Sequence, residues 1–328
     1  MFLKYYLLSV LLIIQLLAFG QQSINQPIIR VARFYGDHDA AICYGFDDGL
    51  KNQADVALPL LDQYGFKGTF FIIPGIIPID GKQGLSTKES INGNISWVKL
   101  KEMSAQGHEI ANHSWSHKNM KTLTDFDLQQ EIDKADQLIL KQIGVFPITF
   151  AYPYNSFDDR VHKAVLKNHI AAREFQFGIG SHFTTRQGNA WADGLIKNYT
   201  WGITMIHGIT KGFDTLSNPQ VLDDHFKYVK SLESKIWVST FAHISKYVTE
   251  RDSSVLDVKY SNNQFTCKLS NHLDPQIYNQ PITIVIEVKN VTSAQATEQG
   301  KAIPVKVTSD KLSIDVVPGA KEFYILWK

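Results

Sequence analysis

The stretch AAICYGFDDG, at residues 40–49, joins a continuous apolar run to a pair of aspartates. An apolar run of this length, without alternation, is typical of a strand buried on both faces of a parallel sheet. Six further runs of this kind follow along the chain, namely KGTFFIIP, HEIANHS, ITFAYPY, IAAREF, GITMIHG and IWVSTFAH. Together they predict an α/β fold, a distorted (β/α)7-type barrel rather than a doubly wound open sheet.

Helical patterns separate these runs. The longest lies between Thr124, which is expected to cap its N-terminus, and Gly144, which is expected to end it. Further helices are expected at Asn52–Tyr64, Trp97–Gln106, Asp158–Asn168 and Pro219–Ser234.

The first twenty residues have the features of a secretory signal peptide. Lys4 supplies the positive start, LLSVLLIIQLLAF forms the apolar core, and Ala18-Phe19-Gly20 fits the small-x-small cleavage pattern. The apolar core is shorter than the roughly 20 residues of a membrane span, although an uncleaved anchor is the alternative. We therefore expect a secreted or periplasmic protein.

The charge balance and the cysteine content limit the partners and the disulfide bonds that can be expected. Without Lys4 the chain holds 32 basic and 32 acidic residues, which gives no argument for nucleic acid or a membrane surface as a partner. Cys43 and Cys267 are far apart in the sequence. We expect Cys43 to be a buried small hydrophobe, with a disulfide to Cys267 as the less favoured alternative.

The sequence changes character near Arg251. Short β-rich runs follow, separated by Asn, Asp, Pro and Gly turn signals and without helical periodicity. This pattern predicts a small all-β module, a sandwich, at residues 253–328, after a catalytic barrel at 21–252 and a signal at 1–20. The module carries few acids or histidines at strand ends, so we expect no catalytic residue in it.

Polar side chains follow the predicted barrel strands where those strands end. In a parallel barrel these ends converge on one face, where catalysis takes place. Singly, each has an ordinary explanation, because DDG is a common turn and a single histidine is more often a partly buried structural residue. Their shared placement argues for a common site formed by Asp47, Asp48, His113, Tyr154, Arg173, His207 and His243.

Two histidines four residues apart, His113 and His117, lie in the stretch ANHSWSH. Within a helical turn this spacing brings both imidazoles to one face, so they can bind one ion. One carboxylate of the pair Asp47–Asp48 would complete a catalytic zinc set of two imidazoles and a carboxylate. Adjacent residues at a strand end point different ways, so the other carboxylate is free to act on water.

Three motifs in this order resemble the polysaccharide deacetylases of carbohydrate esterase family four, the NodB homology domain. They are FDDG at 46–49, HSWSH at 113–117 and MIH at 205–207, and the resemblance covers Ala40–Lys246. It implies a barrel of the polysaccharide deacetylase kind in which Asp47 is the base and His207 the acid. The metal ligands it implies are Asp48, His113 and His117, which would hold Zn²⁺ or another divalent ion such as Co²⁺ or Ni²⁺.

The third motif of that family departs from its usual form. Ala151 stands in AYPY where the family has an arginine that orients the base, whereas Tyr154, whose backbone N–H is the family's oxyanion donor, is kept. Arg173, at the end of the next strand, is our candidate for the missing cation, with a surface arginine as the alternative. Asp193, near Trp191 in AWADG, loosely matches the fourth motif and is expected to keep His207 cationic.

The resemblance implies metal-dependent hydrolysis of N- or O-acetyl groups from an acetylated polysaccharide or oligosaccharide. A glycan-binding protein that has lost the chemistry is one alternative, because Ala151 replaces the motif arginine. A metal-dependent amidohydrolase acting on a cyclic amide or a peptide is another. The export signal and the β module fit an extended extracellular polymer better. No serine-histidine-aspartate arrangement at a nucleophile elbow is present.

Overall fold

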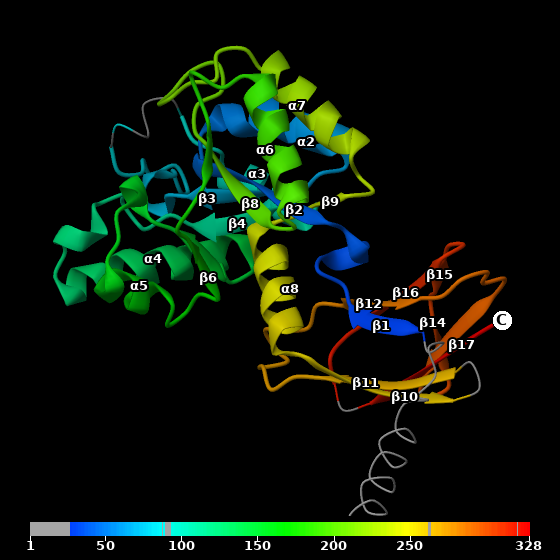
Figure 1. The fold of residues 1–328 in the computed structure, drawn as a ribbon. Coiled ribbons are helices and arrows are strands. Elements are labelled where there is room, and N and C mark those ends of the chain that lie inside the picture. The colour runs from blue at the N-terminus through cyan, green and yellow to red at the C-terminus, as the bar shows by residue number, and fades with distance from the viewer. Residues whose placement is uncertain (1–26, 87, 89–92, 262–263, 320) are drawn as a thin grey trace, which may run out of the picture.

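The computed structural model describes residues 27–86, 88, 93–261, 264–319 and 321–328, and Figure 1 shows its ribbon. The expected signal peptide at 1–20 lies outside the described residues. Among the described residues, no helix combines the length and the apolar character that a membrane span requires.

A curled, all-parallel sheet forms the larger part of the molecule, and its strand order is β6-β5-β4-β3-β2-β8-β7. β9 pairs in parallel with the first residues of β2. The two outermost strands, β6 and β7, are neighbours in the chain, so the barrel is open along a seam between them. The predicted distorted barrel is confirmed. The strands are β2 (Ala40–Asp48), β3 (Gly68–Ile72), β4 (Glu109–Asn112), β5 (Thr149–Ala151), β6 (Ala171–Arg173), β7 (Phe177–Ile179), β8 (Trp201–Ile206) and β9 (Ile236–Val238).

The interior position of β2 in the sheet explains why its sequence is apolar from Ala40 to Phe46. All nine of its residues are buried, because helices cover its outer face and the barrel interior covers the other. Tyr44 and Phe46 belong to a cluster of buried apolar residues that includes side chains of α2 (Leu58–Tyr64), α3 (Trp97–Ala105) and α7 (Gln220–Ser231). Ala41 and Cys43 pack in a second cluster with Phe241. Cys43 is a buried free thiol, as expected.

Helices surround the curled sheet (Figure 1). The expected capping is present, since the Thr124 hydroxyl accepts a hydrogen bond from Asp127 N–H and Gly144 ends the helix with a φ of 90°. α6 was not predicted, although Thr184 and Gln187 form a capping box at its start. The helices are α2 (Leu58–Tyr64), which continues the π-turn Gln53–Ala57, α3 (Trp97–Ala105), α4 (Asp125–Ile143), α5 (Asp159–Val165), α6 (Thr185–Lys197), α7 (Gln220–Ser231) and α8 (Phe241–Ser253).

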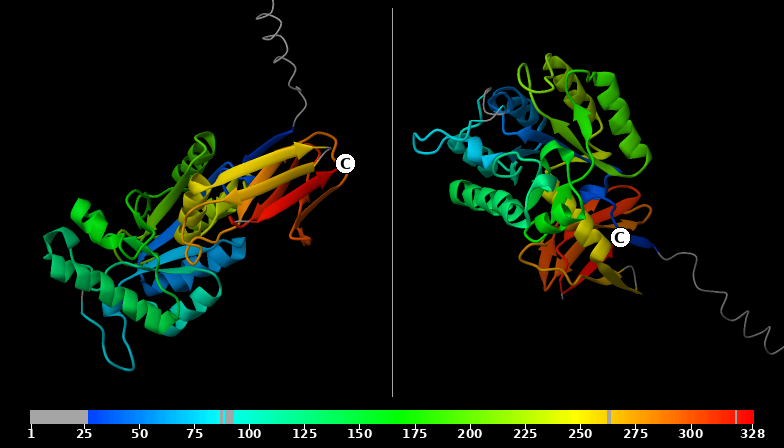
Figure 2. Two further views of the ribbon diagram at one scale, coloured as in Figure 1. Left: turned by 90° about the horizontal axis from the view of Figure 1, so that it is seen from below. Right: turned by 90° about the vertical axis from the view of Figure 1, so that its left-hand side faces the viewer.

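Two antiparallel sheets form the C-terminal module, as Figure 2 shows. One has the order β10-β11-β17-β13-β14 and the other β1-β12-β16-β15, and their inner faces share one apolar core. The predicted all-β module is confirmed. Its strands are β1 (Ile28–Val31), β10 (Val255–Ser261), β11 (Gln264–Ser270), β12 (Ile282–Glu287), β13 (Ala294–Glu298), β14 (Lys301–Ile303), β15 (Lys306–Val307), β16 (Lys311–Val316) and β17 (Glu322–Trp327).

The strand β1 belongs to this module in space, although it precedes the barrel in the chain. Ile28 pairs with Glu287 and Val31 with Ile284, both of β12. The division into 21–252 and 253–328 remains a prediction, but the strand pairing places residues 28–31 with the C-terminal sheets. No local pattern in a four-residue strand reveals a partner some 250 residues away.

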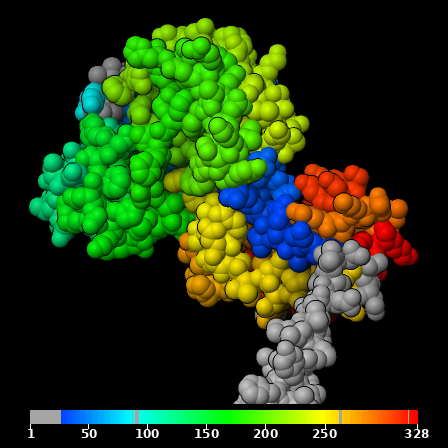
Figure 3. All heavy atoms as spheres, in the orientation of Figure 1, coloured from blue at the N-terminus to red at the C-terminus, as the bar shows by residue number. Residues whose placement is uncertain are grey.

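The helix α8 and the segment after β1 join the barrel to the module (Figure 3). The Tyr247 hydroxyl donates to the Ala32 carbonyl at 3.1 Å, and its ring belongs to the module core. Glu250 accepts hydrogen bonds from Gln280 N–H at 3.0 and 3.1 Å, and burial raises the pKa of this carboxyl to about 7. The two parts therefore share buried contacts as well as a covalent connection.

Candidate active site

The acidic pair lies at the C-terminal end of β2, at the same edge as the ends of its neighbours. In the register with β3, Asp47 stands beside Phe71 and Asp48 beside Ile72. Asp48 has a φ of 71° and Gly49 a φ of 63°, so two successive residues take the left-handed conformation. An aspartate held there is strained, and such strain persists where the surroundings fix it, often at functional sites.

The two histidines of HSWSH are brought together by a loop and not by the helical turn that the spacing suggested. Ser114 and His117 have φ values of 62° and 59°, which no α-helix contains. The His113 backbone N–H donates to the Ile72 carbonyl at 3.0 Å, which ties the loop to the end of β3. The imidazole rings of His113 and His117 lie 5.0 Å apart.

Polar contacts from α4 and the end of β4 support this loop. Asn112 accepts a hydrogen bond from Ser114 N–H at 2.7 Å and donates to the buried Asp136 carboxylate at 2.6 Å. Glu131 accepts from the backbone N–H of Ser116 at 2.8 Å and from its hydroxyl at 2.7 Å. The left-handed turns are thus fixed by a helix that the sequence places just after the motif.

Asp48, His113 and His117 offer ligand atoms that all lie within 4.8 Å of one another. Asp48 Oδ1 is 3.6 Å from Nε2 of each histidine, close to the separation of roughly 3.4 Å between ligands about 2.0–2.1 Å from a tetrahedral zinc. His113 Nδ1 lies 2.8 Å from the Ala151 carbonyl oxygen, which leaves Nε2 as the free lone pair. Burial lowers the pKa of His113 to about 3, so the imidazole is neutral, as a metal ligand must be.

Asp47 forms a buried, bidentate ion pair with Arg173. Arg173 Nη1 donates to one carboxylate oxygen at 2.6 Å and Nη2 donates to the other. Burial alone would raise the pKa of Asp47, but the guanidinium and the nearby His113 and His207 hold it well below its usual range. Arg173 is paired with Ala151 in the β5–β6 register, which explains how the next strand supplies the cation that the motif lacks.

His207 follows β8 and faces the same centre. Its Nε2 lies 3.9 Å from Asp47 Oδ2, and burial lowers its pKa although the Asp47 and Asp214 carboxylates act in the opposite direction. The expectation that Asp193 would keep this histidine cationic is wrong. Asp193 lies on α6, where its carboxylate accepts from the Tyr228 hydroxyl at 2.7 Å.

Asp214 is a second acidic residue, besides Asp47, whose charge acts on His207, and no pattern in the sequence indicated it. Its carboxylate accepts hydrogen bonds from the Ser181 backbone N–H at 2.9 Å and from the Ser181 hydroxyl at 2.8 Å. A Cβ at Gly180 would lie only 2.0 Å from Asp214 Oδ2, so a larger residue at position 180 would displace this carboxylate. His243 is also outside the site, since it lies in the first turn of α8 and contacts Ser239 at 3.3 Å.

The two aspartates of the acidic pair and the histidines His113, His117 and His207 line one cavity of about 460 Å³. Tyr154 is half-exposed at its edge, with a left-handed backbone (φ 59°) and a ring 4.6 Å from that of His117. Lys88 and the exposed Phe213 were not predicted, because neither residue follows the end of a predicted strand. The lining comprises Asp47, Asp48, Leu50, Lys88, His113, His117, Tyr152, Tyr154, Asn155, Met205, His207 and Phe213, all of them from the barrel.

The chain is similar to several known proteins. Residues 36–172 match the family described as polysaccharide deacetylase. The chain is 24% identical to a gellan lyase from a Bacillus species over 89% of its own length and 13% of the relative's. It is 32% identical to chitin deacetylase 1 of Cryptococcus neoformans over 35% of its length and 21% of the relative's.

Among solved structures, one from Mycobacterium smegmatis, whose assignment as a polysaccharide deacetylase is itself provisional, superimposes with a TM-score of 0.51. It covers 72% of this chain and all of its own at 11% identity, a likeness that shows the fold alone. The chain spans between 13% and 26% of the length of the first curated relatives it matches.

Proposed function

We propose that this protein, whose residues 36–172 match the polysaccharide deacetylase family, is a secreted, metal-dependent hydrolase that removes N- or O-acetyl groups from a polysaccharide. The observation that carries the proposal is the juxtaposition of two carboxylates with different surroundings. Asp48 faces two imidazoles, whereas Asp47 forms two hydrogen bonds with Arg173. One carboxylate suits a metal and the other suits a proton.

Asp48, His113 and His117 would hold the metal, for which one carboxylate and two imidazoles favour Zn²⁺, with Co²⁺ or Ni²⁺ as alternatives. When bound, such an ion acts as a Lewis acid toward a carbonyl oxygen and makes water more acidic. The His113–Ala151 hydrogen bond fixes the ring orientation and the tautomer that this role needs.

Asp47 takes the proton from the water that attacks the acetyl carbonyl carbon. The two hydrogen bonds from Arg173 keep its carboxylate ionised and fix its direction. Because its pKa is held below the usual range, Asp47 is a weaker base than a carboxylate in water. Its contribution to the rate therefore depends more on its position than on its basicity. Arg173 is therefore a positioning residue for the base.

The backbone N–H of Tyr154 stabilises the negative charge on the carbonyl oxygen as the tetrahedral intermediate forms. The protonated form of His207 then gives its proton to the nitrogen or oxygen of the sugar as the bond to the acetyl carbon breaks, which releases acetate. The proton that Asp47 took from water returns His207 to its protonated form. His207 Nε2 and Asp47 Oδ2 are 3.9 Å apart, so proton acceptor and proton donor border the same reacting centre.

The match to the polysaccharide deacetylase family and the expected export of the chain support a polysaccharide substrate. Two relatives are named for action on polysaccharides, chitin in one case and gellan in the other, which supports an acetylated polysaccharide or oligosaccharide as substrate. The alternative of a glycan-binding protein without chemistry relied on Ala151. The Arg173–Asp47 pair weakens it, because the base has an arginine partner after all.

Acetate release from a panel of acetylated saccharides tests the proposal. The panel contains an acetylated xylan, an N-acetylated chitin oligomer and a peptidoglycan fragment, with a cyclic amide and an acetylated peptide as the amidohydrolase controls. We expect acetate from at least one saccharide and none from the two controls. Hydrolysis of the cyclic amide alone would assign the protein to the other amidohydrolases.

A further inference from the structure

A second cavity opens beside the seam of the barrel, on the other side of Arg173 from the active site. It has a volume of about 490 Å³, within the range of small-molecule sites, and shares no lining residue with the catalytic cavity. Its walls come from β6 and the segment after it, from α6, from the start of β8 and from α8. We name it the seam pocket, lined by Ala171–Phe177, Trp191, Leu195, Trp201–Ile203, Phe241 and Ser245.

Three buried polar atoms around the seam pocket have no hydrogen-bond partner among the residues that the structure describes. They are Arg173 Nε, Gln176 Oε1 and Ser245 Oγ. Arg173 and Ser245 are only 2% and 8% exposed, so bulk solvent does not readily serve them. Buried polar atoms are nearly always paired, because each unpaired one is costly, and these three therefore indicate a polar occupant.

The three atoms require an occupant that both donates and accepts hydrogen bonds. The Arg173 Nε–H is a donor, the Gln176 oxygen is an acceptor, and the Ser245 hydroxyl can be either. A hydroxyl group supplies both functions from one atom. A carboxylate or a phosphate would satisfy the arginine but would leave the glutamine oxygen facing another acceptor.

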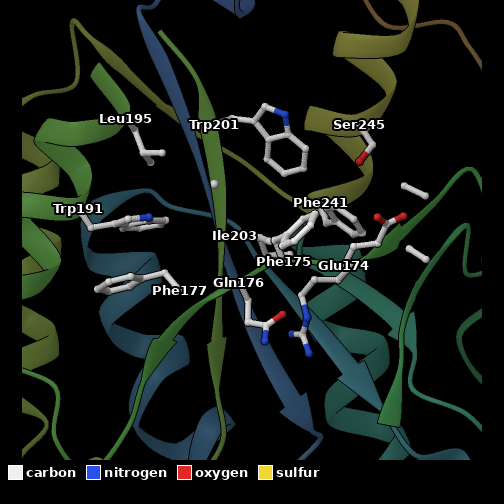
Figure 4. A pocket seen from close by; sticks show the side chains of 14 residues that line it. Glu174, Phe175, Gln176, Phe177, Trp191, Leu195, Trp201, Ile203, Phe241 and Ser245 are labelled. Atoms are coloured by element: carbon white, nitrogen blue, oxygen red, sulfur yellow. The ribbon is translucent and has the colours of Figure 1, made fainter. Parts of the chain in front are cut away.

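Aromatic rings form the rest of the wall. Figure 4 shows Trp201, Phe241 and Ser245 on the side of α8, and Trp191 with Phe177 on the side of α6. Trp191 and Phe177 stack at 4.7 Å, and Phe175 is 84% exposed. The C–H edges of a saturated ring carry partial positive charge and are attracted to aromatic faces, which are negative.

The two charged residues that line the seam pocket already have polar partners. Arg173 is neutralised by Asp47, and Glu174 lies 3.5 Å from His162. A neutral ring with apolar faces and several hydroxyl groups matches the whole wall. We propose that the seam pocket binds a neutral pyranose unit of a glycan, separately from the active site, and the choice of a sugar among neutral ligands rests on the proposed function.

The test measures binding of three neutral tetrasaccharides, cellotetraose, xylotetraose and N-acetylated chitotetraose, to the full mature chain. Tryptophan fluorescence, to which Trp191 and Trp201 contribute, reports binding, and saturation-transfer NMR confirms contact with the sugar. We expect saturable binding of at least one tetrasaccharide. Absence of saturable binding for all three would overturn the proposal.

Matched variants locate the binding. Phe175→Ala and Phe213→Ala each remove one exposed phenylalanine, 84% and 70% exposed, but only Phe175 lines the seam pocket. We expect Phe175→Ala and Ser245→Ala to weaken binding about five- to tenfold, and Phe213→Ala to change it less than twofold. The reverse pattern would assign the sugar to the catalytic cavity and overturn the proposal.

The variants also separate this inference from the proposed function. Because Phe175 is exposed, its replacement leaves the core unchanged, and circular dichroism checks the fold. If the wild type releases no acetate yet loses sugar binding in Phe175→Ala, the proposed function fails and the seam pocket stands. If acetate is released but no tetrasaccharide binds, the seam pocket proposal fails alone.

Discussion

Arg173 stands between two cavities of nearly equal volume, about 460 Å³ for the catalytic cavity and about 490 Å³ for the seam pocket. The catalytic cavity is lined by two aspartates and three histidines, with pKa values displaced for Asp47, His113 and His207. The seam pocket has aromatic rings and unpaired polar atoms. The two cavities are therefore similar in volume but differ in the chemistry of their side chains. Those of the catalytic cavity can transfer protons, whereas those of the seam pocket can bind a ligand.

The largest loss of activity is expected when a metal ligand of the catalytic cavity is replaced. His113→Ala removes one of three ligand side chains, so we expect loss of the bound metal and of all measurable acetate release. Elemental analysis of the purified variant measures the metal. His243→Ala, a histidine outside both cavities, is the control and should keep both properties. Full metal occupancy in His113→Ala would show that the ligands have been assigned incorrectly.

The next effect concerns the base. Asp47→Asn keeps the size and the metal ligands but cannot accept a proton, so kcat should fall about 10²-fold or more while the metal is retained. Asp55→Asn, which alters an exposed aspartate paired with Lys51, is the matched control. Near wild-type turnover in Asp47→Asn would require another residue as the base.

A smaller effect is expected from Arg173→Lys, which keeps the positive charge but not the two parallel hydrogen bonds. Lysine cannot hold both oxygens of Asp47 in one plane, so kcat should fall about tenfold with metal content unchanged. Arg160→Lys, at an exposed pair with Asp125, is the control. An unchanged kcat in Arg173→Lys would mean that orientation of Asp47 does not limit the reaction.

A last effect concerns stability and not turnover, and it distinguishes a buried structural histidine from the histidines of the catalytic cavity. His225 is as buried as His113 but lies outside both cavities, between Tyr44 at 3.1 Å and Asn189 at 3.0 Å. Burial lowers its pKa to about 4, below the value near 6.5 of an unfolded chain. The unfolded state therefore binds the extra proton, and stability is lost as pH falls from about 6.5 toward 4.

Between pH 6.5 and 5 this histidine should remove up to about 2 kcal/mol from the free energy of unfolding. Urea unfolding of the wild type and of His225→Phe at both pH values measures the difference. The variant should lose less stability on acidification than the wild type. An identical loss in both proteins would show that His225 does not titrate with unfolding.

The sequence predicted the parts of the site that follow from one rule of the fold. Parallel strands end at a common edge, so Asp47, His113 and Arg173 could be brought together from their positions alone. The pairing of Arg173 with Asp47 needed only the further step that a neighbouring strand lies within reach of a long side chain. The structure has Ala151 and Arg173 paired in register, which supplies that step.

The parts that were missed depend on contacts that no local pattern encodes. β7 is a three-residue strand with glycine at its centre, and α6 follows it without a strong apolar run. Asp214 comes near His207 because Ser181 anchors its carboxylate. Asp193 was predicted only because it lies close to Trp191 in the sequence. The left-handed residues around HSWSH likewise depend on hydrogen bonds from α4.

Acetate release before and after removal of metal tests the central claim most directly. The wild-type protein is dialysed against a chelator, assayed on the saccharide that gave the highest rate, and assayed again after addition of Zn²⁺, Co²⁺ or Ni²⁺. The account predicts that acetate release stops on chelation and returns with at least one of these ions at about one ion per chain. Undiminished acetate release from protein shown to be free of metal would contradict it.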